Sequence, residues 1–174
     1  MRPRLSVSCS CSLDGYLAAA DGSVDWLEAA GGPAEDHGDD AMLHSLDAVA
    51  MGRATYDALA HLQALPFGDR PVYVFTHRRP PRRPGVVFWS LTPDQAVTHW
   101  TQCGLRRVRI DGGHLVSAFL AEDLVDDLRV VVAPVLLGAG RPLFHPGRPG
   151  ARLDLTTVRS FPSGMVSLQY RRAR

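Results

Sequence analysis

A glycine stands between an apolar run and a helix-like stretch in Met51-Gly52-Arg53-Ala54-Thr55-Tyr56, and this arrangement can hold an anion. Where a strand stops at a glycine and a helix begins, free peptide N–H groups and the positive end of the helix dipole face outward together. Arg53 adds a positive charge and Thr55 adds a hydroxyl, so the turn suits a phosphate group. The alternative is an ordinary strand-to-helix turn with a solvent-exposed arginine.

The same arrangement recurs in Ile110-Asp111-Gly112-Gly113-His114-Leu115, where a buried strand is followed by two glycines and a helix start. Glycine allows a ligand to approach the backbone closely. The stretch lacks the Gly-x-Gly-x-x-Gly spacing of the Rossmann fingerprint, which argues against a Rossmann domain. It predicts a second anion-binding turn, but two glycines before a helix are common, so the motif is weak when taken alone.

Arginines follow a third buried strand, in Thr76-His77-Arg78-Arg79. Guanidinium groups recognise phosphate with paired N–H donors, so this stretch suits a terminal phosphate; a solvated basic loop is the alternative. In an open sheet, ligands bind beyond the carboxyl ends of the strands, and all three motifs follow such ends. Two anion-binding turns and an arginine pair together match a dinucleotide that carries an extra 2′-phosphate.

Strand and helix signals alternate along the chain and would bring the three motifs to one edge of a sheet. Leu5, Val7, Cys9 and Cys11 share one face of a period-two pattern, which predicts a first strand ending near Ser12. A long loop is predicted over residues 13–34. Further strands are expected at 48–51, 72–75, 86–89, 108–111, 128–135, 153–158 and 165–171, and helices at 36–45, 53–59, 93–103 and 114–121. The pattern predicts an α/β fold with a mixed sheet flanked by helices.

Composition bounds the partner and the compartment. The chain has 174 residues and a net charge of +1, which fits one domain over 1–174 and argues against a nucleic-acid-binding protein. A small-molecule partner is expected instead. All nineteen basic residues are arginine, which excludes lysine-based catalysis. Three cysteines suit a reducing, cytoplasmic environment, and the longest apolar run, 130–137, is too short to cross a membrane. No metal is expected, because the acidic stretch 35–40 is better explained as a solvated helix start.

Taken in order, these motifs resemble the RibD C-terminal, dihydrofolate-reductase-like family, as a stand-alone member. The segments that carry the resemblance are Ser12 to Tyr16, Asp47 to Tyr56, Val74 to Thr76, Asp111 to Leu115, Leu124 to Leu128 and Pro134 to Phe144. The resemblance covers about residues 5 to 170. It implies a mixed, mostly parallel central sheet of about eight strands flanked by helices, with an antiparallel C-terminal hairpin. It also implies NADPH lying across the carboxyl edge of the sheet.

The resemblance assigns residues to parts of the cofactor. Near the phosphates would be Gly52, Arg53 and Thr55. Near the adenosine 2′-phosphate would be Thr76, His77 and Arg78, with Arg79 as a further candidate. The pyrophosphate would be held by Gly112, Gly113 and Leu115. The Gly112–Gly113 peptide bond is expected to be cis, as in relatives.

Two carboxylates are candidates for catalysis. Hydride transfer to a C=N bond becomes easier when the nitrogen gains a proton, so an acid beside the substrate is useful. Asp14 stands in the motif where similar riboflavin-pathway reductases place an aspartate by the substrate; a turn residue is the alternative. In dihydrofolate reductases the acid lies on the helix before the strand that ends at the glycine, and the separation of Asp36 from Gly52 resembles that spacing. Asp39 and Asp40 are alternates. The structural alternative for Asp36 is a helix cap. Trp26 would either stack on a planar substrate or cap the core.

The sequence departs from both better-known relatives. It lacks the Pro-Trp-x-x-Pro loop typical of dihydrofolate reductase, and it has neither a deaminase domain nor a lysine. We therefore expect an NADPH-dependent oxidoreductase that transfers hydride to a small pteridine- or pyrimidine-like heterocycle. Dihydrofolate reductase proper and a non-catalytic nucleotide-binding protein are the alternatives. Relatives are often dimers, and the strand 130–137 with its glycine-rich extension would supply a homodimer interface.

Overall fold

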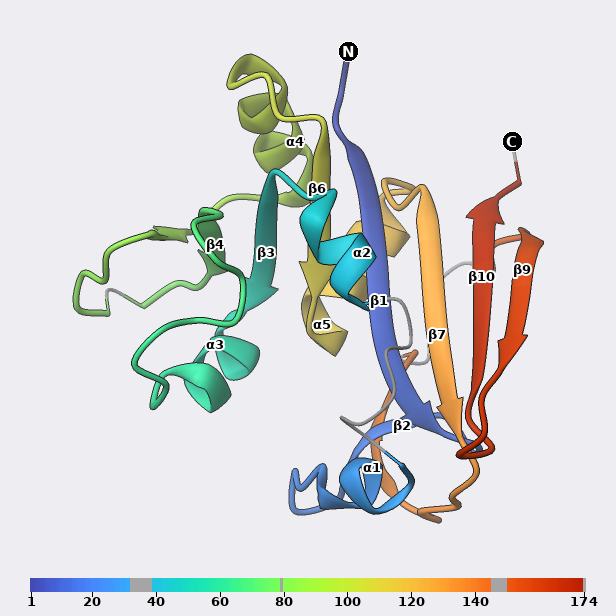
Figure 1. Ribbon diagram of the computed structural model, residues 1–174. Coiled ribbons are helices and arrows are strands. Elements are labelled where there is room, and N and C mark those ends of the chain that lie inside the picture. Colours follow the sequence, from blue (N-terminus) through green and yellow to red (C-terminus); the bar gives the residue numbers. More distant parts are fainter. Residues whose placement is uncertain (32–38, 79, 145–149, 174) are drawn as a thin grey trace.

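Six parallel strands and an antiparallel pair form the central sheet (Figure 1). The computed structural model describes residues 1–31, 39–78, 80–144 and 150–173. The strands in spatial order are β5 (Val86–Trp89), β4 (Val72–Phe75), β3 (Ala48–Gly52), β6 (Arg107–Asp111), β1 (Arg4–Ser12), β7 (Asp127–Ala133), β10 (Val166–Arg172) and β9 (Leu153–Ser160). The predicted mixed, mostly parallel sheet with an antiparallel C-terminal hairpin is confirmed.

Helices lie on both faces of this sheet. They are α1 (Asp25–Ala29), α2 (Asp39–His44), α3 (Arg53–Leu59), α4 (Pro93–Gln102) and α5 (Gly113–Ala121). In Figure 1, α1 and α2 lie in front of the sheet and α5 lies behind it. We call these the front and back faces. A separate two-stranded ribbon of β2 (Tyr16–Ala19) and β8 (Gly140–Pro142) lies at the lower end of β1 in Figure 1.

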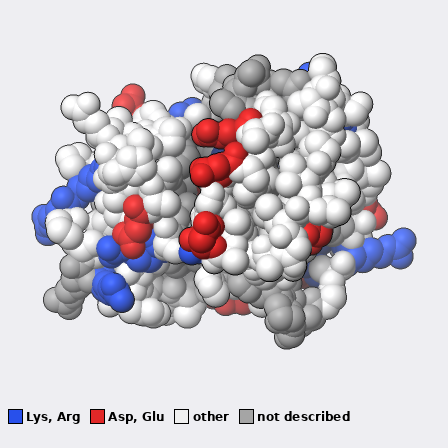
Figure 2. Space-filling view, turned by 90° about the horizontal axis from the view of Figure 1, so that it is seen from below, with Lys and Arg blue, Asp and Glu red and all other residues white. Residues whose placement is uncertain are grey.

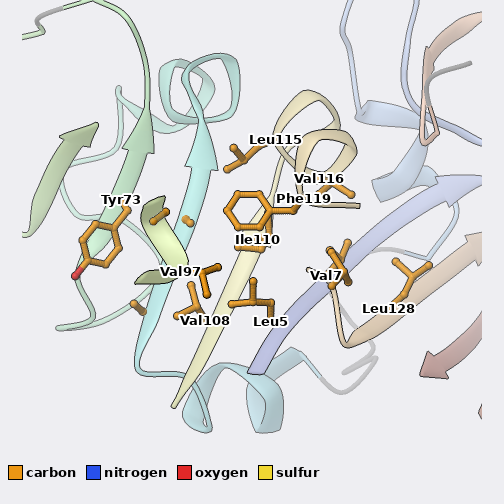
Figure 3. Close-up of a cluster of buried hydrophobic side chains, with 14 of the residues drawn as sticks. Leu5, Val7, Tyr73, Val97, Val108, Ile110, Leu115, Val116, Phe119 and Leu128 are labelled. Carbon is orange, nitrogen blue, oxygen red and sulfur yellow. The ribbon is translucent and has the colours of Figure 1, made fainter. Parts of the chain in front are cut away.

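Alternation along β1 makes the back face apolar. Leu5 lies opposite Val108 of β6, and Val7 lies opposite Ile110. These side chains pack against Phe119 of α5, and Figure 3 shows the Phe119 ring beside Ile110. Helices cover the faces of parallel sheets, and the apolar side chains between this face and its helices form the main core of the protein.

The other side of β1 carries serines, Ser6, Ser8, Ser10 and Ser12, and so makes part of the front face polar. Ser8 lies opposite Arg129 of β7, and the buried Arg129 donates from Nε to the Ser8 Oγ at 2.9 Å. Farther along the same face, β3 and β4 are apolar and pack against α3. The front face therefore combines an apolar end, under α3, with a polar middle.

Two sequence predictions differ from the structure. The segment predicted as a long loop over 13–34 contains β2 and α1 within its described part. The strand β2 forms only because it pairs with β8, more than a hundred residues away, so no local pattern could reveal it. The strand predicted over 128–135 ends at Ala133, since Pro134 has no N–H to continue a ladder. Of the helix predicted over 36–45, residues 36–38 lie outside the described part.

No helix in the described ranges is both long enough and apolar enough to cross a membrane. The three cysteines are free thiols. Within the same ranges, no cluster of His, Cys, Asp and Glu side chains has the arrangement of a metal site.

Candidate functional site

The two glycine turns lie side by side at the carboxyl edge of the sheet. Strands β3 and β6 are neighbours, and Met51 is the register partner of Asp111. A Cβ added to Gly112 would lie 2.4 Å from the Thr55 Oγ1 and 3.7 Å from the Gly52 backbone nitrogen. The second turn therefore packs directly on the first, and the two predicted anion sites form one continuous surface.

Neither of the two helix starts is capped by a side chain. The N-cap residues of α3 and α5 are Gly52 and Gly112, and no side-chain hydrogen bond caps either helix. The contrast is α4, where the Thr92 Oγ1 accepts from the Gln95 N–H and the Gln95 side chain accepts from the Thr92 N–H. Because no side chain caps α3 or α5, an anion can take the capping role at either helix start.

The chain turns in opposite directions at these two strands. From β3 it passes through α3 to β4, and α3 packs on the cluster that contains Met51 and Val74. From β6 it passes through α5 and beyond β1 to β7, and α5 packs on the opposite cluster with Ile110. This is the topological switch point of an open α/β sheet, where ligands bind.

The Gly112–Gly113 peptide bond is trans, so the cis bond expected from relatives is wrong for this structure. Gly112 instead turns the chain with a φ of 87°, a left-handed conformation that side-chain-bearing residues rarely adopt. The side chain of Leu115, in the first turn of α5, is buried in the main core, and its Cβ lies 3.9 Å from the position of a Cβ added to Gly52.

Arg53 begins α3 and is partly exposed. Its Nε pairs with the Asp57 Oδ1 one helical turn later, at 2.6 Å. Arg53 therefore lies beside the helix start, and the Asp57 carboxylate orients its guanidinium group. Thr55, half-buried, lies between the two turns.

The arginine-containing loop after β4 lines a hollow of about 740 Å³. Within it, the Thr76 Oγ1 accepts the Arg78 N–H at 3.0 Å, and the His77 Nδ1 lies 2.8 Å from the Ser90 Oγ. The hollow is also lined by Arg82, which the sequence analysis missed although it belongs to the same arginine run. Arg79 lies outside the described residues. In Figure 2, which looks onto the carboxyl edge, basic side chains gather on the side of α3 and β4 and acidic ones lie along the middle.

Asp14 links the end of β1 to the segment that follows β7. Its carboxylate accepts hydrogen bonds from the Ser12 hydroxyl at 2.6 Å and from the Gly138 N–H at 2.7 Å, with the Leu137 N–H at 3.1 Å. These bonds, the Ser12 one foremost, hold the pKa of Asp14 below its usual value. A carboxylate that stays ionised is poorly suited to donate a proton, so the geometry favours the binding role predicted for Asp14 over the catalytic one.

The other predicted catalytic residue, Asp36, and the other predicted substrate-binding residue, Trp26, have different outcomes. Asp36 lies outside the described residues, so its catalytic role stays a prediction. Trp26 of α1 packs against the small front-face cluster that includes Val131 and Phe161, and its Nε1 is buried without a hydrogen-bond partner among the described residues. The structure favours the core-capping interpretation of Trp26.

Asp111 and Arg109 are site residues that the sequence analysis missed. The Asp111 carboxylate accepts the Gly112 N–H at 2.7 Å and the Arg109 Nη2 at 3.3 Å. Arg109 also donates to the Ser8 carbonyl, and its Nε is buried without a partner among the described residues. Both alternate with Val108 and Ile110 along β6, and that alternation already places them on the polar front face.

Comparison with known proteins identifies the family of the chain. The family model of the RibD C-terminal domain matches residues 3–167. The uncharacterized protein YwjB of Bacillus subtilis is 35% identical over 165 residues, covering 93% of this chain and 94% of that protein. The crystal structure of a candidate riboflavin biosynthesis protein from Shewanella sp. PV-4 superposes with a TM-score of 0.88 at 27% identity and full coverage of both chains.

A further solved structure shares the fold. It is a diaminohydroxyphosphoribosylaminopyrimidine deaminase/5-amino-6-(5-phosphoribosylamino)uracil reductase from Thermotoga maritima, with a TM-score of 0.76 at 16% identity. This chain is covered over 99% of its length, against 57% of that protein. With the family model matching nearly its whole length and the central sheet in agreement, the chain belongs to the RibD C-terminal domain family.

Proposed function

We propose that this protein is an NADPH-dependent reductase that transfers hydride to a small pteridine- or pyrimidine-like heterocycle. The observation that carries the proposal is the pair of uncapped, glycine-led helix starts, packed together at the switch point of the sheet. A dinucleotide brings two linked phosphates to one place, and this surface offers two sets of N–H donors at one place.

The residues present fit such a cofactor. The N–H groups that follow Gly52 and Gly112 would hold the pyrophosphate, and Arg53 would neutralise part of its charge. The hollow beyond β4 would take the adenosine end, with Arg78 and Arg82 on the 2′-phosphate. When bound, NADPH would supply the hydride.

The carboxylates would then orient the substrate. Asp14, ionised and fixed by three hydrogen bonds, would accept N–H groups of a heterocycle rather than release a proton. Asp36 remains the candidate proton donor. The relationship to a named pyrimidine reductase supports the heterocyclic substrate class.

A homodimer is part of the proposal. The edge strand β9 exposes more than half of the Leu155 and Val158 side chains, and apolar residues on an exposed edge favour association. The interface would then lie nearer this hairpin than the run 130–137 named from sequence. Sedimentation should give twice the chain mass, and Leu155→Glu should shift it to the chain mass.

Cofactor binding is the direct test. Quenching of tryptophan fluorescence should show NADPH binding at least about tenfold tighter than NADH. Arg78→Gln should weaken NADPH about tenfold and leave NADH unchanged, because the variant loses a charge-assisted bond to the 2′-phosphate only. The exposed Arg152 lies away from the hollow, so Arg152→Gln should change neither affinity. Absence of binding by both cofactors would overturn the proposal.

A further inference from the structure

The arginines that line the hollow beyond β4 differ in what their side chains contact. The Arg78 and Arg82 side chains are exposed and make no hydrogen bond or ion pair within the described part of the chain. The Arg83 side chain is half-buried and donates hydrogen bonds to three backbone carbonyl groups. Arg78 and Arg82 are therefore open to a ligand, whereas Arg83 is engaged with the protein itself.

The three carbonyl groups lie at the end of α3 and just after it. The Arg83 Nη2 donates to the Leu62 carbonyl at 2.6 Å and to the Gln63 carbonyl at 3.4 Å. Its Nη1 donates to the carbonyl of Ala60, the C-cap of α3, also at 3.4 Å. The last carbonyl groups of a helix have no partner within the helix, and a positive charge there also matches the helix dipole. Arg83 therefore caps the end of α3 from the loop that follows β4.

Two further contacts attach the hollow to α3. The Arg83 backbone carbonyl accepts the Val86 N–H at 3.1 Å, in the turn that leads into β5, so the residue is fixed at its backbone as well as at its side chain. Phe88 of β5, which lines the hollow, packs edge-on against Tyr56 of α3, with ring centroids 5.4 Å apart. The hollow is thus held to α3 by a polar contact at the helix end and an apolar contact at its middle.

Helix α3 connects the two parts of the proposed cofactor surface. Its first turn, after Gly52, belongs to the proposed pyrophosphate site, and its last turn carries the Arg83 contact. The pyrophosphate and the 2′-phosphate of a dinucleotide are joined by covalent bonds. The molecule therefore gains from both subsites at once only where the separation of the subsites matches its own. A short helix with the hollow attached to its end fixes that separation.

We propose that Arg83 is a positioning residue: it holds the 2′-phosphate hollow at the correct distance from the pyrophosphate turn and so sets the preference for NADPH. This inference rests on the proposed function. Arg78 and Arg82 would contact the phosphate, and Arg83 would not, because a phosphate bound to Arg83 would draw its donors away from the carbonyl groups that they satisfy.

The test compares a ligand that spans both subsites, NADPH, with one that fills only the hollow, adenosine 2′-monophosphate, by isothermal titration calorimetry. Arg83→Gln should weaken NADPH about tenfold, because the loop is no longer fixed to α3, and should leave adenosine 2′-monophosphate within about twofold. Arg78→Gln should weaken both ligands about tenfold, because it loses a contact to the phosphate itself. Arg152→Gln, exposed and outside the hollow, should change neither affinity.

A second variant guards against a folding defect in the first. Arg83→Lys keeps the positive charge at the end of α3 but loses the forked pair of donors, so it should show the same selective loss at a smaller size, roughly threefold for NADPH. Melting temperatures of both variants show whether each one is folded.

Each outcome has one meaning. A loss confined to NADPH supports the positioning role. An equal loss for both ligands would show that Arg83 contacts the phosphate or that the hollow has collapsed, and a lower melting temperature with both affinities unchanged would show a merely structural contact. Either result overturns the inference and leaves the proposed function in place. If the unmodified chain fails to bind NADPH, the proposed function itself is overturned, and the inference with it.

Discussion

Substituting Gly112 by alanine tests the contact between the two turns. Alanine meets two costs there: a φ of 87°, and a Cβ 2.4 Å from the Thr55 Oγ1. The left-handed conformation costs roughly 1–2 kcal/mol for a residue with a Cβ, and overpacking typically costs about 1–3 kcal/mol. We expect Gly112→Ala to lower the free energy of unfolding by about 3 kcal/mol. For a chain of this size, that corresponds to a fall in Tm of roughly 6–12 °C.

Two further variants separate these costs. Gly85 has a φ of 74° and nothing within 4 Å of its added Cβ, so Gly85→Ala should show the conformational cost alone, roughly 1–2 kcal/mol. Adding Thr55→Ala to Gly112→Ala removes the clashing hydroxyl, so the double variant should recover the steric part. The assay is urea unfolding followed by circular dichroism, with single variants as references.

The reasoning would be refuted by either of two results. If Gly112→Ala costs no more than Gly85→Ala, the two turns are not in contact. If Thr55→Ala brings no recovery in the Gly112→Ala background, the cost arises from something other than the Thr55 hydroxyl.

Three more predictions follow from the structure. Hydrogen bonds from a hydroxyl and from backbone N–H groups lower the pKa of Asp14, so its stabilisation is present above its ordinary pKa of 3.8 and is lost as pH falls through the lower folded value. Asp14→Asn should therefore lower the urea midpoint at neutral pH and flatten the fall of that midpoint with decreasing pH. An unchanged pH dependence would contradict a stabilising role for the Asp14 hydrogen bonds. Thr92→Ala should cost about 1 kcal/mol through loss of the capping box, whereas the exposed mid-helix Thr98→Ala should cost under about 0.5 kcal/mol in the same melts. Burial raises the pKa of the Cys9 thiol to about 12, so a thiol reagent at pH about 8 should label the exposed Cys103 first, and fast labelling of all three cysteines would be inconsistent with this packing.

Much of the fold could be predicted from the sequence because its signals are local. A capping box lies within four residues, and the helix predicted from residue 93 does begin at Pro93, directly after the N-cap Thr92. Period-two alternation of Leu5 and Val7 identified the first strand, since side chains on a strand alternate between its faces. The two glycine turns were also visible locally, because each lies between a buried strand and a helix start.

Predictions failed where distant segments meet. The strand β2 lies in a stretch with no strong strand signal, and it exists because Tyr16 and Ala19 pair with the Gly140–Pro142 strand. The hydrogen bonds of Asp14 could not be predicted either, because two of its donors are the backbone N–H groups of Leu137 and Gly138, in the segment after β7. No residue near Asp14 in the sequence indicates those donors.

By itself, the sequence determined most of the element types, the family motifs and the three anion-binding candidates, because backbone propensity, capping and periodicity act over a few residues. Only the tertiary structure decided which candidates share a surface: strand order places Gly112 against Thr55, while the arginine loop lines a separate hollow. It also decided that Asp14 meets the backbone N–H groups of Leu137 and Gly138. These contacts follow from strand adjacency, which is set by burial of the whole core rather than by any local run of residues.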